Sequence, residues 1–215
     1  MTATDRPRLV LVHGATSGPW VFDAWLPHLA AFDVRVPDLQ VGLEVASATM
    51  SDYADRVMAA AGGGGAVLCG WSMGGLVAML AALRQPVAAL VLVEPSQPRQ
   101  LGRADPSVTP VAGTYDAESM YGPLPADTRH RPESRFALGE RRRGVDIPLV
   151  ESPLLVVAGS SHPVDRGRDV VDHYGGELLE FPDLDHTGLV RDPGVAVAIA
   201  DWLTTTTRGR SRAWR

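Results

Sequence analysis

Short apolar runs and longer amphipathic stretches alternate along most of the chain. Runs rich in valine and leucine are typical of strands buried on both faces, and they cover residues 9–14, 33–39, 66–71, 87–95, 152–160 and 177–182. Longer stretches between or after them predict helices over residues 19–31, 51–61, 73–85, 167–176 and 193–203. Strands that alternate with crossover helices lie parallel in one sheet. The pattern therefore predicts an α/β fold, with a mostly parallel central sheet and helices on both faces.

One segment, residues 97–148, interrupts this alternation. It is rich in proline, glycine and arginine and has no long apolar period. Because it lies between two strands of one sheet, we interpret it as an excursion at the sheet edge, and we favour a lid over a ligand site against a solvated loop. The sequence thus predicts a single domain over residues 1–215 with a lid or insertion at 97–148. The polar tail, residues 204–215, is expected to be frayed.

Composition narrows the possible partners. The chain has 215 residues, 45% of them hydrophobic, with a net charge of -5 and no dominant basic face, so nucleic acid is not an expected partner. No apolar run is as long as a membrane span, and the N-terminus "MTATDRPR" has no apolar signal core. We expect a cytoplasmic protein without a membrane partner, and the sequence makes no prediction of its oligomeric state.

Two residue types limit the possible chemistry. All 20 basic residues are arginine, so a lysine Schiff base, a pyridoxal phosphate anchor and a P-loop lysine are excluded. The single cysteine, Cys69, excludes an internal disulfide and a multi-cysteine zinc site, and its place in a predicted strand indicates a buried hydrophobic residue. The sequence implies no metal and no cofactor.

The strongest motif is "CGWSMGG" at residues 69–75. Gly70-Trp71-Ser72-Met73-Gly74 fits G-x-S-x-G, and it lies between a predicted strand and a predicted helix, as that motif requires. A serine on such a sharp turn has a strained backbone, and glycines two residues away on each side avoid clashes with it. We therefore predict that Ser72 is a nucleophile, which also requires a base and donors for an oxyanion.

Three segments of the chain resemble the α/β-hydrolase fold family. "LVLVHGATSGPWVFDAWLPHLA" followed by "VPDL" is similar to the opening of its small esterase and hydroxynitrile-lyase-like branch. "CGWSMGG" resembles its nucleophile turn, and "FPDLDHTGLVRDPGVAVAIADWL" its histidine loop and last helix. The resemblance spans residues 9–203, apart from the insertion. It implies truncated N-terminal strands, since the chain starts directly at the "LVLVHG" strand, and a short lid over an open site.

The resemblance also implies roles for other residues. His186 lies late in the chain on a loop, where the family places its base. The backbone N–H groups of Ala15 and Met73 correspond to the oxyanion hole, and His13 to a residue that shapes the oxyanion loop and takes no proton.

The acid is less clear from the sequence, because His162 stands where the family usually has an aspartate. Asp165, three residues later, is one candidate. Glu94, at the end of "LVLVE" in the strand predicted at 87–95, is the other. We favour Glu94 because a strand end is rigid and lies near the base.

These residues predict a serine-dependent hydrolase that acts on a carboxylic ester, thioester or lactone through an acyl-enzyme, with a small-molecule acyl substrate. Two alternatives remain open at this point. One is a hydroxynitrile-lyase-like or cyclase-type proton-transfer enzyme, and the other is a non-catalytic ligand-binding or signalling module.

Overall fold

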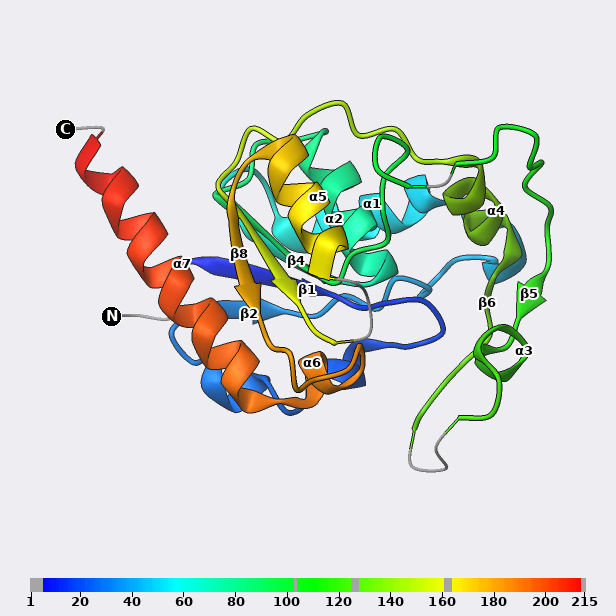
Figure 1. Ribbon diagram of the computed structural model, residues 1–215, viewed down its shortest axis with the longest axis horizontal. Coiled ribbons are helices and arrows are strands. Elements are labelled where there is room, and N and C mark those ends of the chain that lie inside the picture. Colours follow the sequence, from blue (N-terminus) through cyan, green and yellow to red (C-terminus); the bar gives the residue numbers. More distant parts are fainter. Residues whose placement is uncertain (1–5, 103, 125–127, 161–163, 214–215) are drawn as a thin grey trace.

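The computed structural model describes residues 6–102, 104–124, 128–160 and 164–213, with side chains described except at 164–166 and 207–213. Its main sheet has six strands in the order β2-β1-β3-β4-β7-β8, and all neighbouring strands are parallel (Figure 1). The strands are β1 (Arg8–Val12), β2 (Asp33–Arg35), β3 (Val67–Trp71), β4 (Ala89–Val93), β7 (Leu154–Ala158) and β8 (Glu177–Glu180). The predicted fold class is confirmed.

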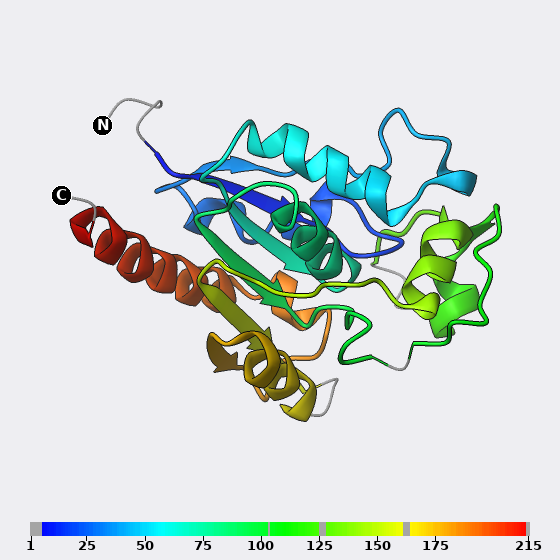
Figure 2. The same cartoon turned by 90° about the horizontal axis from the view of Figure 1, so that it is seen from above.

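Helices cover both faces of the sheet (Figures 1 and 2). One face carries α1 (Met50–Ala61), α2 (Met73–Ala82) and α5 (Val164–Tyr174), and the other carries α6 (Gly188–Arg191) and α7 (Pro193–Ala213). Successive strand residues point to opposite faces, so Val10 and Leu68 join the first core, whereas Leu11 and Cys69 join the second. Cys69 is fully buried, as the sequence predicted.

The predicted helix over residues 19–31 is wrong. This segment instead forms two short 3₁₀ helices, η2 (Pro19–Phe22) and η3 (Leu26–His28). Both contain a proline in their first two positions, and Pro27 has no N–H with which to continue a helix begun before it. The apolar side chains of the segment still enter the core, because Phe22 and Trp25 are fully buried. The periodicity therefore predicted burial correctly but not the helix type.

The C-terminal segment also differs from expectation. We expected a helix that ends at residue 203 and a frayed tail, but α7 continues to Ala213. Once a helix is nucleated, each further residue adds one backbone hydrogen bond, and no proline interrupts this stretch. Hydroxyl groups of the threonine run bond back to the helix, since Thr204 Oγ1 donates to the Ala200 carbonyl oxygen at 2.8 Å.

The insertion has secondary structure of its own. It comprises β5 (Thr114–Tyr115), α3 (Ala117–Tyr121), β6 (Glu133–Ser134) and α4 (Arg135–Arg143), and β5 pairs antiparallel with β6. Figure 2 shows these elements beyond the edge toward which the strands of the main sheet point. Three bonds tie the insertion to the segment that enters α1. Ser134 Oγ donates to the Ala48 carbonyl oxygen at 2.7 Å, Gly113 N–H donates to the Ala46 carbonyl oxygen at 2.8 Å, and Met50 N–H donates to Glu140 at 2.7 Å.

In the part of the chain that the structure describes, no helix is both long enough and apolar enough to cross a membrane.

Candidate active site

Ser72 occupies a strained turn between β3 and α2. Its backbone has φ 56° and ψ −122°, which is rare for a residue other than glycine. Three hydrogen bonds hold this conformation: Ser72 N–H donates to Val93 at 3.0 Å, and the Ser72 carbonyl oxygen accepts from Gly75 at 3.0 Å and Ser96 at 2.9 Å. Met73 is the first residue of α2, and the first N–H groups of a helix have no acceptor within it. The turn thus places the serine directly before the N-terminus of α2, beside the Met73 N–H group.

Glycines make room for this turn. A Cβ atom on Gly70 would lie 2.2 Å from the Gly74 carbonyl oxygen, and one on Gly74 would lie 2.1 Å from a carbonyl oxygen of β1. Both distances are too short for any side chain, which explains the spacing of the G-x-S-x-G motif. A Cβ atom on Gly14 would lie 2.8 Å from the Trp71 ring and 3.1 Å from the Ser72 Cβ atom. The loop after β1 therefore passes directly beside the serine.

The structure brings His186 and Glu94 together. His186 lies in the loop between β8 and α6, and its Nδ1 atom is 2.5 Å from Glu94 Oε2. Trp71, the residue before Ser72, ties this loop to the serine turn. Its Nε1–H donates to the His186 carbonyl oxygen at 2.9 Å, and the two ring centroids are 4.9 Å apart. The histidine is thus held near the serine, at the edge of the sheet formed by the carboxyl ends of the strands.

Glu94 directly follows β4, and only 3% of its side chain is exposed. Its second oxygen, Oε1, accepts a hydrogen bond of 2.8 Å from the Gly159 N–H group at the end of β7. A Cβ atom on Gly159 would lie 3.0 Å from that oxygen and 2.4 Å from the Leu184 carbonyl oxygen, so a larger residue would displace the carboxylate. Glu94 is therefore fixed from one side and directed at the histidine from the other.

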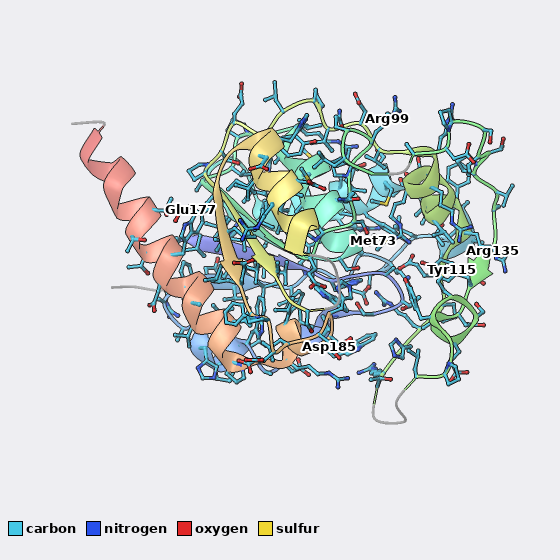
Figure 3. All side chains as sticks on the ribbon, in the orientation of Figure 1. Met73, Arg99, Tyr115, Arg135, Glu177 and Asp185 are labelled. Carbon is cyan, nitrogen blue, oxygen red and sulfur yellow. The ribbon has the colours of Figure 1, made fainter. Side chains whose placement is uncertain are left out.

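The structure does not describe the side chain of Asp165, the other candidate for the acid. Asp165 belongs to α5, but its side chain lies outside the described residues, and His162 lies outside them entirely. Figure 3 labels Met73, which follows the serine, and Asp185, which precedes the histidine, at the edge of the sheet that faces the insertion. Tyr115 and Arg135 of the insertion lie farther out from that edge (Figure 3).

The loop after β1 has the hydrogen bonds expected of an oxyanion loop. The Gly14 carbonyl oxygen accepts from Ser17 Oγ and from His13 Nδ1, both at 2.9 Å. His13 Nε2 accepts from the Leu39 N–H group at 3.2 Å, so the ring is neutral and its proton is on Nδ1. In a trans peptide the N–H group points away from the preceding carbonyl. By fixing the Gly14 carbonyl, these side chains also fix the direction of the Ala15 N–H group.

Burial keeps His13 neutral, and this makes stability depend on pH. Complete burial lowers the pKa of His13 from 6.5 to about 4. Between these two pH values the imidazole binds a proton more readily in the unfolded chain than in the folded one. The contribution of His13 to the free energy of unfolding is therefore fully present above about pH 6.5 and decreases as the pH falls toward 4. We expect this group to contribute a loss of about 3 kcal/mol over that range.

The measurement is the free energy of unfolding in urea at pH 7 and pH 4. In His13→Gln the loss between the two pH values should be smaller than in the wild type. His28→Gln, which changes an exposed histidine, should keep the wild-type loss. An equal loss in His13→Gln and the wild type would contradict the neutral buried ring.

Sequence reasoning missed two contributors to the site. The first is Trp71, which stood in the motif as a variable residue although it is only 7% exposed and its indole binds the histidine loop. The second is Gly159, whose N–H group orients Glu94. A glycine that ends an apolar strand was the only signal of it. Among the described residues, no group of three or more histidine, cysteine, aspartate or glutamate side chains could hold a metal ion.

Comparison with known proteins identifies the family. The sequence model of the alpha/beta hydrolase family matches residues 9–200. The chain belongs to the α/β-hydrolase family.

Within this family, curated relatives share about a third of the aligned residues. A pimeloyl-[acyl-carrier protein] methyl ester esterase of Aromatoleum aromaticum is 37% identical over 150 residues, which are 65% of this chain and 59% of the relative. The enzyme of the same name from Yersinia pseudotuberculosis is 34% identical over 160 residues, 68% of this chain and 58% of the relative. The aligned part of this α/β hydrolase thus spans just under three fifths of each of these relatives.

Solved structures of the family share the fold. Polyneuridine aldehyde esterase superimposes with a TM-score of 0.66 at 18% identity, over 93% of this chain and 100% of that one. A pyrethroid hydrolase from Sphingobium faniae JZ-2 superimposes with a TM-score of 0.67 at 20% identity, over 92% and 97% of the two chains. At this level of identity the likeness shows that the architecture of an α/β hydrolase is preserved.

Proposed function

We propose that this α/β hydrolase is a serine-dependent carboxylic ester hydrolase that works through an acyl-enzyme. The observation that carries the proposal is the 2.5 Å contact between His186 Nδ1 and Glu94 Oε2, next to the strained turn of Ser72. A carboxylate that accepts from Nδ1 of a histidine leaves Nε2 as the nitrogen that takes a proton from a serine hydroxyl. Ester-hydrolysing relatives in the same family support the same reaction class.

In the proposed mechanism, Ser72 Oγ bonds to the acyl carbon while its proton moves to His186 Nε2. The Ala15 and Met73 N–H groups donate to the oxygen that becomes negative. When this intermediate collapses, the bond to the alcohol breaks and His186 returns the proton to the departing oxygen. Water then attacks the acyl-enzyme in the same way, with His186 as its base, and the carboxylic acid leaves. Glu94 stabilises the positive charge on the imidazole in both halves of the reaction.

For the substrate, we propose a methyl or other small-alcohol ester of an acyl chain. The curated relatives are named as esterases of a methyl ester on a carrier-bound acyl group, and this chain shares about a third of the aligned residues with them. Thioesters and lactones present the same acyl carbon to the serine and belong to the same proposal. The expectation of a cytoplasmic protein remains a prediction.

We further propose that residues 1–215 act as one α/β domain in which the insertion, residues 97–148, borders the substrate site. Of the six arginines between residues 129 and 143, four donate hydrogen bonds to acceptors within the protein, and Arg135 and Arg142 bond to Thr114 and Met120 of the insertion itself. Arg131 pairs with Asp38, and Arg141 donates to the Tyr115 hydroxyl at 3.0 Å. The positive charge of the insertion is therefore largely used to hold the insertion in place.

The acyl-enzyme can be tested by partitioning. Phenyl and p-nitrophenyl butyrate would be hydrolysed by the enzyme in the presence of hydroxylamine, which competes with water for an acyl-enzyme. Because both esters give the same butyryl-enzyme, we predict one ratio of hydroxamate to butyric acid for both. If the ratio of hydroxamate to butyric acid differs between the phenyl and the p-nitrophenyl ester, the two esters do not share a covalent intermediate. That result would favour direct attack by water.

A further inference from the structure

The returning limb of the insertion, residues 129–134, lies against the oxyanion loop, residues 13–17. We call this limb the strap. Arg131 N–H donates to the Thr16 carbonyl oxygen at 2.9 Å, and Thr16 N–H donates to Glu133 Oε2 at 3.2 Å. Thr16 has φ 58°, a left-handed conformation that a threonine keeps only when its surroundings hold it. The strap thus binds both backbone polar groups of the strained residue next to Ala15.

Glu133 is the first anchor of the strap, and it is completely buried. Its other oxygen, Oε1, accepts from the Tyr53 hydroxyl at 2.5 Å and from the Ser134 N–H group at 2.8 Å. A buried carboxylate is costly unless donors surround it, and here three donors do so. Burial and the nearby Glu133 carboxylate raise the pKa of Tyr53 above its usual value, so the hydroxyl keeps its proton and donates. The carboxylate therefore links α1 to the oxyanion loop.

Arg131 is the second anchor. Its guanidinium donates to both oxygens of Asp38, at 2.6 and 2.8 Å, and its Nη2 atom is 3.2 Å from His13 Nε2. Burial raises the pKa of Asp38, but the hydrogen bonds from Arg131 outweigh this and leave it below its usual range. The charged pair therefore persists at neutral pH. Arg131 also contacts the His13 ring, whose Nδ1–H group holds the Gly14 carbonyl in place.

We propose that Glu133 and Arg131 are positioning residues for the oxyanion hole. They hold the loop at Thr16 and His13, and through it they fix the direction of the Ala15 N–H group. This inference rests on the proposed function, because it assigns that N–H group to the transition state of ester hydrolysis. Loss of an oxyanion donor costs about 10² to 10³ in rate, and a misdirected donor loses part of this. A contact made only in the transition state changes kcat and leaves KM nearly unchanged.

The test compares Glu133→Gln with the wild type in the hydrolysis of p-nitrophenyl butyrate. Glutamine has the same size as glutamate, but its amide N–H groups would face the groups that donate to the carboxylate in the wild type, so at least one of those hydrogen bonds is lost. We expect kcat per active site to fall about 10- to 100-fold with KM nearly unchanged. Active sites are counted by complete labelling with a fluorophosphonate, which removes unfolded protein from the comparison. Glu118→Gln, an exposed change in α3 of the same insertion, should keep the wild-type kcat.

A purely structural role of Glu133 would lower the melting temperature and leave kcat per site unchanged, and that result would overturn the proposal. A change in KM alone would overturn it too. The acid limb of the pH–rate profile should not move, because His186 and Glu94 are not altered.

If Glu133→Gln does not fold, the same measurement is made on Tyr53→Phe, which removes only one donor to the carboxylate. We then expect kcat per site to fall about fivefold, the effect of one hydrogen bond, and a wild-type value would overturn the proposal. An active wild type with an unchanged Glu133→Gln overturns only the positioning role. A wild type that hydrolyses no ester overturns the proposed function and the inference together.

Discussion

Replacement of Ser72 by alanine is expected to reduce kcat for p-nitrophenyl butyrate by about 10⁶, the scale seen when a serine nucleophile of this kind is removed. The alanine variant retains the oxyanion donors and the Glu94–His186 pair, so it can still bind the ester but cannot form the acyl-enzyme. The hydroxyl is also a small part of the turn, whose shape depends on backbone bonds to Val93, Gly75 and Ser96.

Because these bonds involve backbone atoms only, Ser72→Ala should fold with an unchanged circular dichroism spectrum. Ser107→Ala, which changes an exposed serine of the insertion, provides the matched control and should have wild-type kcat. Turnover in folded Ser72→Ala within tenfold of the wild type would show that another group attacks the ester.

The second large effect is expected at the acid. Glu94→Gln should reduce kcat by about 10⁴, because an amide in this position no longer holds the imidazole in the tautomer that accepts the serine proton. Glu94 is in contact with His186 Nδ1 and is fixed by the Gly159 N–H group, so the substitution changes charge and tautomer while the backbone stays in place. The measurement is kcat per labelled active site across the pH range.

Asp165→Asn is the matched comparison, because Asp165 is the other carboxylate that the sequence offers. We expect it to retain wild-type kcat. If Asp165→Asn loses activity while Glu94→Gln keeps it, the acid lies after β7 rather than after β4. If neither variant loses activity, a serine–histidine pair suffices and the assignment of Glu94 fails.

The sequence predicted the features of the fold and site that depend on local pattern. Strands buried on both faces must be apolar throughout, so the strands that carry His13, Ser72 and Glu94 at or just beyond their carboxyl ends were visible as apolar runs. The carboxyl ends of parallel strands lie at one edge, which is why residues far apart in the sequence could be expected to meet there. His186 and Glu94, 92 residues apart, do meet.

Other features depend on contacts that no local pattern contains. Glu133 stands in a charged, arginine-rich stretch, where a carboxylate is normally exposed. Its burial follows from a hydroxyl on Tyr53, 80 residues away, and from the Thr16 N–H group, 117 residues away. The prediction of a helix at residues 19–31 was wrong for a different reason. Its apolar spacing was helical, but its prolines favoured short 3₁₀ turns.

The most direct test of the central claim is the site of covalent labelling by a fluorophosphonate. This reagent forms a stable adduct with a serine that is activated as a nucleophile. After incubation, we predict that the intact mass of the wild type increases by one adduct, that peptide mapping places it on Ser72, and that Ser72→Ala gains none. A wild type that stays unmodified, or an adduct that forms equally on Ser72→Ala, would contradict Ser72 as the nucleophile.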